Sequence, residues 1–219
     1  MVKHYRLTNL STFVDLSTYC NAACPQCHRT NPNSLEKADW LPLIQWSLKD
    51  FQNKYPVEDL WRYFSFDICG TWGDPAMNKD IDKICKYILD NSNARIELST
   101  NGSMRDEMWW YELGVSCGSR LNVIFTVDGI NQEMHERYRQ KTDLSKILSH
   151  MEAVSETKAT ASSITILFKH NYKYKEQIKE LCRSHGAKST HTKISDRFWD
   201  GTKTYFNNDE EYLEYAFAD

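Results

Sequence analysis

The sequence predicts an α/β fold, a partial (β/α)6 TIM-like barrel with a parallel sheet. Short runs of β-branched and aromatic residues alternate with longer segments of helical periodicity. Such alternation indicates parallel strands joined by right-handed helical crossovers. Six strand–helix units can be recognised, fewer than the eight of a closed barrel. An open doubly wound sheet is the alternative that the same pattern allows.

Each expected strand is a short apolar run that ends at a turn signal or a polar residue. The second run stops at Gly70, and the fourth is closed by the turn pair Asp128 and Gly129. The six expected strands cover residues 12–16, 63–69, 95–99, 121–127, 163–168 and 189–194.

The expected helices repeat apolar residues every three to four positions. In the segment 79–90, for example, Ile81, Ile84 and Ile88 recur on one face. The helix expected to begin at Lys175 ends before Gly186, a residue type that commonly follows a helix. The expected helices cover residues 41–53, 79–90, 105–113, 144–155 and 175–185, with one more over 209–217.

Length and composition indicate a soluble globular protein. The 219 residues are 41% hydrophobic and 26% charged, with a formal net charge of −3, so the whole chain carries no strong signal of nucleic-acid binding. No apolar run is long enough to cross a membrane, and the first residues resemble no secretory signal. We therefore expect a cytoplasmic protein whose seven cysteines are reduced. The expected core domain covers 1–195, and a C-terminal extension, in part helical, covers 196–219.

The unusual segments of the sequence follow the first four expected strands. They are residues 18–27, 70–75, 101–102 and 128–129. Ligands of parallel α/β folds bind at the carboxyl ends of the strands. We therefore expect these segments to form one site. The basic stretch 169–197 is either a solvated helix face or a patch for an anionic substrate.

Three cysteines lie close together after the first strand. Cys20, Cys24 and Cys27 have the spacing C-x-x-x-C-x-x-C. Soft thiolates select iron–sulfur clusters, zinc or copper(I). A structural zinc site takes four ligands, and His28 is the adjacent candidate for the fourth. A cluster held by three cysteines instead leaves one iron open for a cofactor or substrate.

The order of the motifs resembles that of the radical S-adenosylmethionine (radical SAM) superfamily. The three-cysteine motif resembles the signature of that superfamily. Residues 70–75 (GTWGDP) resemble its Gly-Gly-Glu-Pro motif, and residues 99–102 (STNG) resemble its Ser/Thr-Asn-Gly motif. The resemblance implies a [4Fe–4S] cluster on Cys20, Cys24 and Cys27, with S-adenosyl-L-methionine on the fourth iron.

Later segments resemble the peptide-maturase (SPASM/twitch) branch of this superfamily. They are residues 125–129 (FTVDG), 138–139 (YR) and 168–171 (FKHN). The chain is thus similar to the core domain of that branch. Because no cysteine follows Cys182, we expect no C-terminal domain with auxiliary clusters.

The resemblance also implies which residues contact S-adenosylmethionine. Gly73 and Asp74 are expected to bind its amino group. Ser99 and Asn101 are expected at its ribose or carboxylate, and Arg139 at its carboxylate. Gln26 replaces a common aromatic residue and is expected to bind the adenine.

The implied activity is reductive cleavage of S-adenosylmethionine to a 5′-deoxyadenosyl radical. This radical would abstract a hydrogen atom from a peptide or protein, with flavodoxin or ferredoxin as the electron donor. Two alternatives stay open: radical modification of a nucleotide or small metabolite, and a non-catalytic metal-binding module on the same fold. Cys69, at the end of the second strand, is a candidate catalytic thiol or else an inert core residue.

Overall fold

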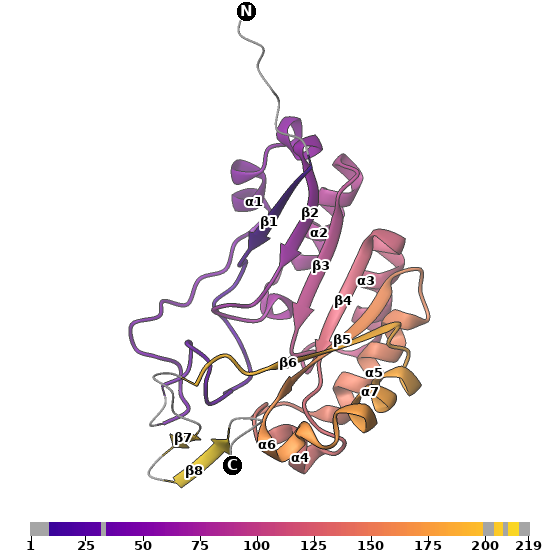
Figure 1. Cartoon of the computed structure of the whole chain (residues 1–219). Helices are drawn as coiled ribbons and strands as arrows, with labels where there is room; N and C mark the ends of the chain where they lie inside the picture. The colour runs from indigo at the N-terminus through magenta and orange to yellow at the C-terminus, as the bar shows by residue number, and fades with distance from the viewer. Residues whose placement is uncertain (1–8, 32–33, 199–203, 208–209, 215–219) are drawn as a thin grey trace, which may run out of the picture.

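The computed structural model describes residues 9–31, 34–198, 204–207 and 210–214. Its centre is a six-stranded parallel sheet whose strands lie side by side in chain order (Figure 1). The strands are β1 (Leu10–Val14), β2 (Tyr63–Ile68), β3 (Arg95–Thr100), β4 (Leu121–Thr126), β5 (Thr160–Leu167) and β6 (Ser189–Ile194). A separate antiparallel pair follows, formed by β7 (Thr204–Asn207) and β8 (Glu210–Glu214).

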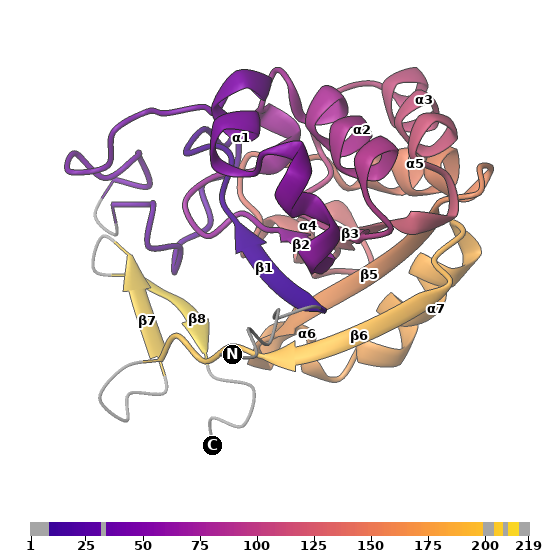
Figure 2. The same ribbon diagram turned by 90° about the horizontal axis from the view of Figure 1, so that it is seen from above.

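Helices cover the outer face of the curved sheet (Figure 2). The α-helices are α1 (Leu48–Lys54), α2 (Ile81–Asn91), α3 (Glu107–Cys117), α4 (Gln132–Glu136), α5 (Leu144–Ser155), α6 (Lys169–Tyr172) and α7 (Lys175–Ser184). Three short 3-10 helices are η1 (Val57–Arg62), η2 (Pro75–Met77) and η3 (Gly118–Arg120). None of the helices in the described residues is long and apolar enough to cross a membrane.

The strand order distinguishes between the two folds that the sequence allows. A doubly wound sheet reverses its strand order at a switch point, which places helices on both faces. Here the order runs from β1 to β6 without a reversal, so right-handed crossovers leave the helices on one face. Because β1 and β6 pair only with β2 and β5 in the described part of the chain, the sheet is not closed. The predicted partial barrel is confirmed.

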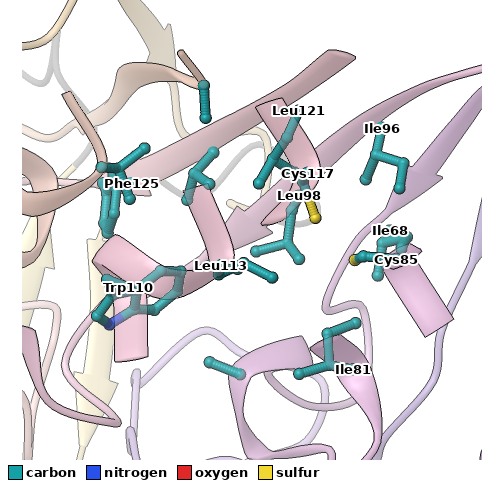
Figure 3. Packing of buried hydrophobic residues seen from close by; sticks show 14 of the residues in the cluster. Ile68, Ile81, Cys85, Ile96, Leu98, Trp110, Leu113, Cys117, Leu121 and Phe125 are labelled. Carbon is teal, nitrogen blue, oxygen red and sulfur yellow. The ribbon is translucent and has the colours of Figure 1, made fainter. Parts of the chain in front are cut away.

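Alternate residues of each strand pack beneath the helices. Ile96 and Leu98 of β3 are fully buried, whereas Glu97 between them is half-buried on the opposite face. Trp110 of α3 packs against Phe125 of β4, with ring centroids 5.3 Å apart (Figure 3). This alternation gives the sheet an apolar outer face and leaves its concave face for polar side chains.

Three of the cysteines belong to this apolar core. Cys85 of α2, Cys117 of α3 and Cys182 of α7 are buried, and Figure 3 shows the first two among the aliphatic side chains. A small buried cysteine behaves as an apolar residue. Cys85 and Cys182 are therefore core residues.

The first predicted helix begins later than the periodicity suggests. The sequence predicts a helix over residues 41–53, but α1 starts at Leu48 because Ser47 caps it. The Ser47 Oγ accepts the Asp50 N–H, and the Asp50 carboxylate accepts the Ser47 N–H, which forms a capping box. The residues before the cap instead contact the segment that follows β1, because the Thr18 N–H donates to the carbonyl oxygen of Ile44 at 2.9 Å.

The helix expected over 209–217 is wrong where the chain is described. Residues 210–214 form β8, which pairs with β7. Tyr205, Phe206 and Tyr212 are residue types with high strand propensity, and strand pairing overrides the weak helical pattern. Residues 209 and 215–217 of that prediction lie outside the described residues.

Candidate active site

The carboxyl ends of β1 to β4 lie at the same edge of the sheet, as their parallel pairing requires (Figure 1). The segments that follow these strands enclose a cavity of about 130 Å³. Residues of the first three predicted segments line the cavity. Asp128 of the fourth segment does not line it, but it binds Arg139, which does. The lining residues are Cys20, Ala22, Cys24, Cys27, Arg29, Gly70, Gly73, Asp74, Ser99, Thr100, Asn101, Thr126 and Arg139.

The three motif cysteines share this cavity. Their loop folds back on itself, because the Cys27 N–H donates to the carbonyl oxygen of Cys24 at 3.0 Å. Burial raises the pKa of the Cys20 and Cys24 thiols. Their thiolate forms therefore need a nearby cation to replace the lost hydration. A bound metal centre supplies that compensation.

The arrangement fits an iron–sulfur cluster better than a zinc ion. Within the described ranges, no three His, Cys, Asp or Glu side chains are placed to hold a single metal ion. Zinc, with sulfur ligands at about 2.3 Å, draws its thiolates close together, whereas thiolates on separate irons of a cluster stand further apart. His28, the candidate fourth zinc ligand, packs edge-on against Trp72 with a centroid distance of 6.0 Å.

Two glycines let the loop after β2 lie directly against the cysteine loop. A Cβ atom on Gly73 would collide with the carbonyl oxygens of Ser17 and Tyr19. One on Gly70 would collide with the carbonyl oxygen of Gly73. The next residue, Asp74, donates its N–H to the carbonyl oxygen of Tyr19 at 2.7 Å. Glycine is therefore required here by the close approach of two backbones.

The Asp74 carboxylate is buried and connects two of the loops. It accepts hydrogen bonds from Ala76 N at 2.9 Å, Thr100 Oγ1 at 2.9 Å and Asn101 N at 2.7 Å. Burial raises the pKa of this carboxyl, and the three donors oppose that effect. A carboxylate offers about four acceptor positions. The three donors occupy three of these positions, so the expected contact with an ammonium group is limited to the acceptor position that is left.

Asn101 supports the cysteine loop. Its Nδ2 donates to Asn21 Oδ1 at 2.9 Å and lies 3.7 Å from Cys20 Sγ. Its Oδ1 accepts the Ser103 N–H at 2.9 Å. Ser99 lines the cavity beside it. The structure therefore brings both predicted residues to the cavity, with the Asn101 amide held by protein partners.

Arg139 reaches the cavity but is already paired. Its Nε donates to Asp128 Oδ2 at 2.6 Å, and Asp128 Oδ1 accepts the Ile166 N–H at 2.6 Å. The Asp128 side chain is fully buried, and the Arg139 side chain is 14% exposed. Arg139 Nη1 lies 3.8 Å from Cys24 Sγ. Asp128 thus already balances the positive charge of Arg139, the residue that was expected to bind a ligand carboxylate.

A buried histidine holds the segment that carries this pair. The Asp128 N–H donates to His135 Nδ1 at 3.1 Å, so the ring proton is on Nε2, which lies 3.0 Å from Thr142 Oγ1. The Thr142 hydroxyl donates in turn to the carbonyl oxygen of Arg139 at 2.6 Å. Burial lowers the pKa of His135 to about 3, with the charge of Arg139 as a further cause. The ring therefore stays neutral and its role is structural.

Gln26 lies against the segment that follows β6. Its Nε2 donates to the carbonyl oxygen of Arg197 at 3.1 Å, and its Oε1 accepts the Ser195 hydroxyl at 2.9 Å. Arg197 Nη1 donates to the Gln26 carbonyl oxygen at 3.0 Å. The side chain that was expected to bind adenine therefore joins the cysteine loop to the end of β6.

A second cavity of about 160 Å³ lies beside the first. Cys24, Cys27, Gly70 and Arg139 line both. The rest of its wall is formed by Tyr138, Ile166, Lys193, Ile194, Ser195, Asp196 and Arg197. Cys69 lies outside the described lining of both cavities, with its thiol 3.9 Å from Thr71 Oγ1.

Sequence reasoning missed Arg29, Ser195 and Arg197. Arg29 follows the third motif cysteine by two positions and lines the first cavity. Its place beside the cysteines is the only signal that the sequence offers. Ser195 carries no local signal, and Arg197 has only its place in the basic stretch 169–197, because their partner Gln26 is distant in the chain.

A comparison with protein families matches residues 14–182 to the Radical SAM superfamily. Two curated proteins are similar in sequence. A probable GTP 3′,8-cyclase of Methanocaldococcus jannaschii is 24% identical over 175 residues, which are 80% of this chain and 55% of that protein. A GTP 3′,8-cyclase of Aliarcobacter butzleri is 25% identical over 208 residues, which are 90% of this chain and 59% of that protein. The chain thus spans somewhat more than half the length of these relatives.

Solved structures share the fold at low sequence identity. Streptococcus suis SuiB bound to S-adenosylmethionine superposes with a TM-score of 0.69 and 12% identity, over 90% of this chain and 42% of SuiB. The enzyme anSMEcpe with bound AdoMet gives a TM-score of 0.64 and 19% identity, over 85% of this chain and 50% of that chain. The TM-scores show a common fold.

Proposed function

Because the chain belongs to the Radical SAM superfamily, we propose that Cys20, Cys24 and Cys27 bind a [4Fe–4S] cluster whose fourth iron takes S-adenosylmethionine. The main support is that the three thiols line one cavity together with Asp74. S-adenosylmethionine and an iron–sulfur cluster are the cofactors of this superfamily. When bound, they supply reductive cleavage to a 5′-deoxyadenosyl radical that abstracts a hydrogen atom from the substrate.

Two side chains are placed to tune the cysteine sulfurs. Asn101 Nδ2 lies 3.7 Å from Cys20 Sγ, and Arg139 Nη1 lies 3.8 Å from Cys24 Sγ. Hydrogen bonds to the sulfurs are among the features that set the potential of a cluster. A donor or positive charge favours the more negative, reduced state. These two residues therefore make reduction of the cluster easier.

The loop after β2 is suited to the amino group of S-adenosylmethionine. An ammonium group needs acceptors, and Gly73 and Asp74 bring a backbone carbonyl and a carboxylate to the cavity wall. Three protein donors fix the Asp74 carboxylate in one orientation. Ser99, on the same wall, is suited to the ribose or the carboxylate.

The first candidate substrate is a peptide or protein segment. The free edges of β1 and β6 leave the sheet unclosed in the described residues, and an open barrel gives an extended chain lateral access to the carboxyl edge. The solved structures of similar fold include SuiB bound to its precursor peptide SuiA. A one-electron donor such as flavodoxin or ferredoxin would reduce the cluster.

A nucleotide is the second candidate, favoured by the sequence relatives. Both curated relatives are named GTP 3′,8-cyclases. Arg197 at the second cavity is a cation that suits a phosphate group, whereas Lys193 there is paired with Asp196 at 2.7 Å. Comparing peptides and nucleoside triphosphates as additives in the assay below separates the two candidates.

Formation of 5′-deoxyadenosine tests the proposed activity. The protein is reconstituted anaerobically with iron and sulfide, reduced with dithionite and incubated with S-adenosylmethionine. We expect 5′-deoxyadenosine and methionine from the native sequence and from Cys69→Ala, and neither product from Cys24→Ala. Equal amounts of product from the two variants would contradict the assignment of Cys24 as a ligand. A native protein that holds the cluster but forms no product would contradict the proposed cleavage of S-adenosylmethionine.

A further inference from the structure

Arg29 is a buried cation with few partners among the described residues. Its side chain belongs to a residue that is only 9% exposed. Its Nε donates to the carbonyl oxygen of Thr18 at 3.1 Å. In the described part of the chain, no carboxylate lies within ion-pair distance of it. A guanidinium carries five N–H donors, so most of its hydrogen-bonding capacity is left for a ligand.

The unused N–H donors of Arg29 are available to a ligand in the cavity. Arg29 lines it together with the three motif cysteines and Asp74. Burying a charge without a partner is costly. The site is therefore complete only when a negatively charged group occupies the cavity.

The backbone around Arg29 fixes the direction of its side chain. Its carbonyl oxygen accepts the Ala38 N–H at 2.8 Å, and the Thr30 N–H donates to the carbonyl oxygen of Cys27 at 2.8 Å. Thr30 and Lys37 form an antiparallel bridge across the same loop. Together with the Thr18 contact, these bonds hold the guanidinium before a ligand arrives. Such preorganisation lowers the entropy cost of binding.

Arg139 offers a direct contrast in the same cavity. Asp128 balances its charge at 2.6 Å, and the Asp128 carboxylate is fully buried. A second carboxylate at Arg139 would share a cation that is already neutralised. No carboxylate of the described residues pairs with Arg29, so a ligand carboxylate gains more at Arg29 than at Arg139.

We propose that Arg29 binds the carboxylate of the methionine moiety of S-adenosylmethionine, a role that rests on the proposed function. A planar guanidinium matches a carboxylate through two parallel N–H···O bonds. The ammonium then lies toward the acceptors of Gly73 and Asp74, which line the same cavity. This assignment moves the carboxylate contact from Arg139, where sequence resemblance puts it, to Arg29.

A binding comparison with two ligands tests this role. Equilibrium dialysis measures the dissociation constants of S-adenosylmethionine and of its decarboxylated analogue on the anaerobically reconstituted, unreduced protein. For Arg29→Gln we expect S-adenosylmethionine to bind roughly 10- to 100-fold more weakly, because a hydrogen bond to a charged group is lost. The decarboxylated analogue should bind Arg29→Gln and the native protein within about a factor of two.

Two further variants control for charge and folding. Arg183 lies on α7 in an exposed pair with Glu180, and Arg183→Gln should keep both affinities. Arg29→Lys keeps the charge but lacks the planar fork, so its loss for S-adenosylmethionine should be intermediate. Iron content and thermal midpoint are recorded for each protein.

The outcomes separate this inference from the proposed function. Equal weakening of both ligands by Arg29→Gln, or no weakening, would overturn the role of Arg29 while native cleavage stands. If Arg29→Gln loses iron, Arg29→Lys decides the test. The role is then overturned if Arg29→Lys keeps its iron and still prefers S-adenosylmethionine over the decarboxylated analogue as strongly as the native protein does. A native protein that neither binds nor cleaves S-adenosylmethionine would instead refute the proposed function.

Discussion

Replacing Cys24 by alanine is expected to abolish binding of the iron–sulfur cluster and to leave the parallel sheet folded. Cys24 is buried and lines both cavities, and its loss leaves two thiolates in the loop. Two ligands hold a cluster far less well than three, because each thiolate bonds a separate iron. The measurement is iron and sulfide per chain after anaerobic reconstitution, with circular dichroism for the fold.

Matched cysteine variants make this result specific. Cys20→Ala and Cys27→Ala should lose the cluster in the same way. Cys69→Ala should keep it, because Cys69 lies outside the described lining of the cavities. Cys85→Ala should also keep it, at a modest loss of stability from the core of α2. Full iron content in any of the three motif variants would refute the assignment of that residue.

Asp128→Asn is expected to lower the free energy of unfolding by about 3–5 kcal/mol, the cost of leaving one partner of a buried ion pair uncompensated. The Asp128 carboxylate is fully buried and serves both Arg139 Nε and the Ile166 N–H. Its neutral amide retains one acceptor oxygen but balances no charge. Urea unfolding of the protein without its cofactors measures the change, through the midpoint and the slope.

A surface aspartate provides the control for this substitution. Asp90 pairs with Lys86 at 2.8 Å, and both side chains are more than half exposed. Asp90→Asn should change the free energy of unfolding by less than about 0.5 kcal/mol, as is usual for exposed pairs. Equal effects of the two substitutions would show that the Asp128–Arg139 pair does not stabilise the fold.

Local patterns in the sequence predict most of the sheet and the position of the cysteine loop. The alternation of buried Ile96 and Leu98 with Glu97 marks β3, and similar runs mark the other strands of the six-stranded sheet. Since parallel strands share one carboxyl edge, the motif after each strand could be assigned to a common site. The structure brings three of these segments to one cavity, and Asp128 of the fourth reaches it only through Arg139.

Long-range contacts explain what the sequence could not predict. Gln26 binds Ser195 and Arg197, which lie about 170 positions away, through contacts that no local pattern encodes. Family resemblance treated Asp74 and Arg139 as free to bind a ligand, whereas Thr100 and Asp128 already engage them. Arg29 gave no periodic or motif signal. Its burial, and the lack of a carboxylate partner for it among the described residues, are properties of the folded loop.

The strand pair β7–β8 illustrates a different limit. A short segment with mixed propensity takes the structure that its neighbours allow. Residues 210–214 pair with β7, and Lys169 Nζ of α6 contacts Glu214 Oε2 of β8 at 2.6 Å. This contact links β8 to α6 and cannot be read from residues 210–214 alone.

The central claim is that one iron of the cluster is left open by the three cysteines and takes S-adenosylmethionine. Electron–nuclear double resonance on the reduced cluster, with S-adenosylmethionine labelled isotopically at its amino nitrogen, tests this claim most directly. We expect a hyperfine coupling from the labelled nitrogen in the native protein, which indicates a bond to iron. A reduced cluster with bound S-adenosylmethionine and no such coupling would contradict the account.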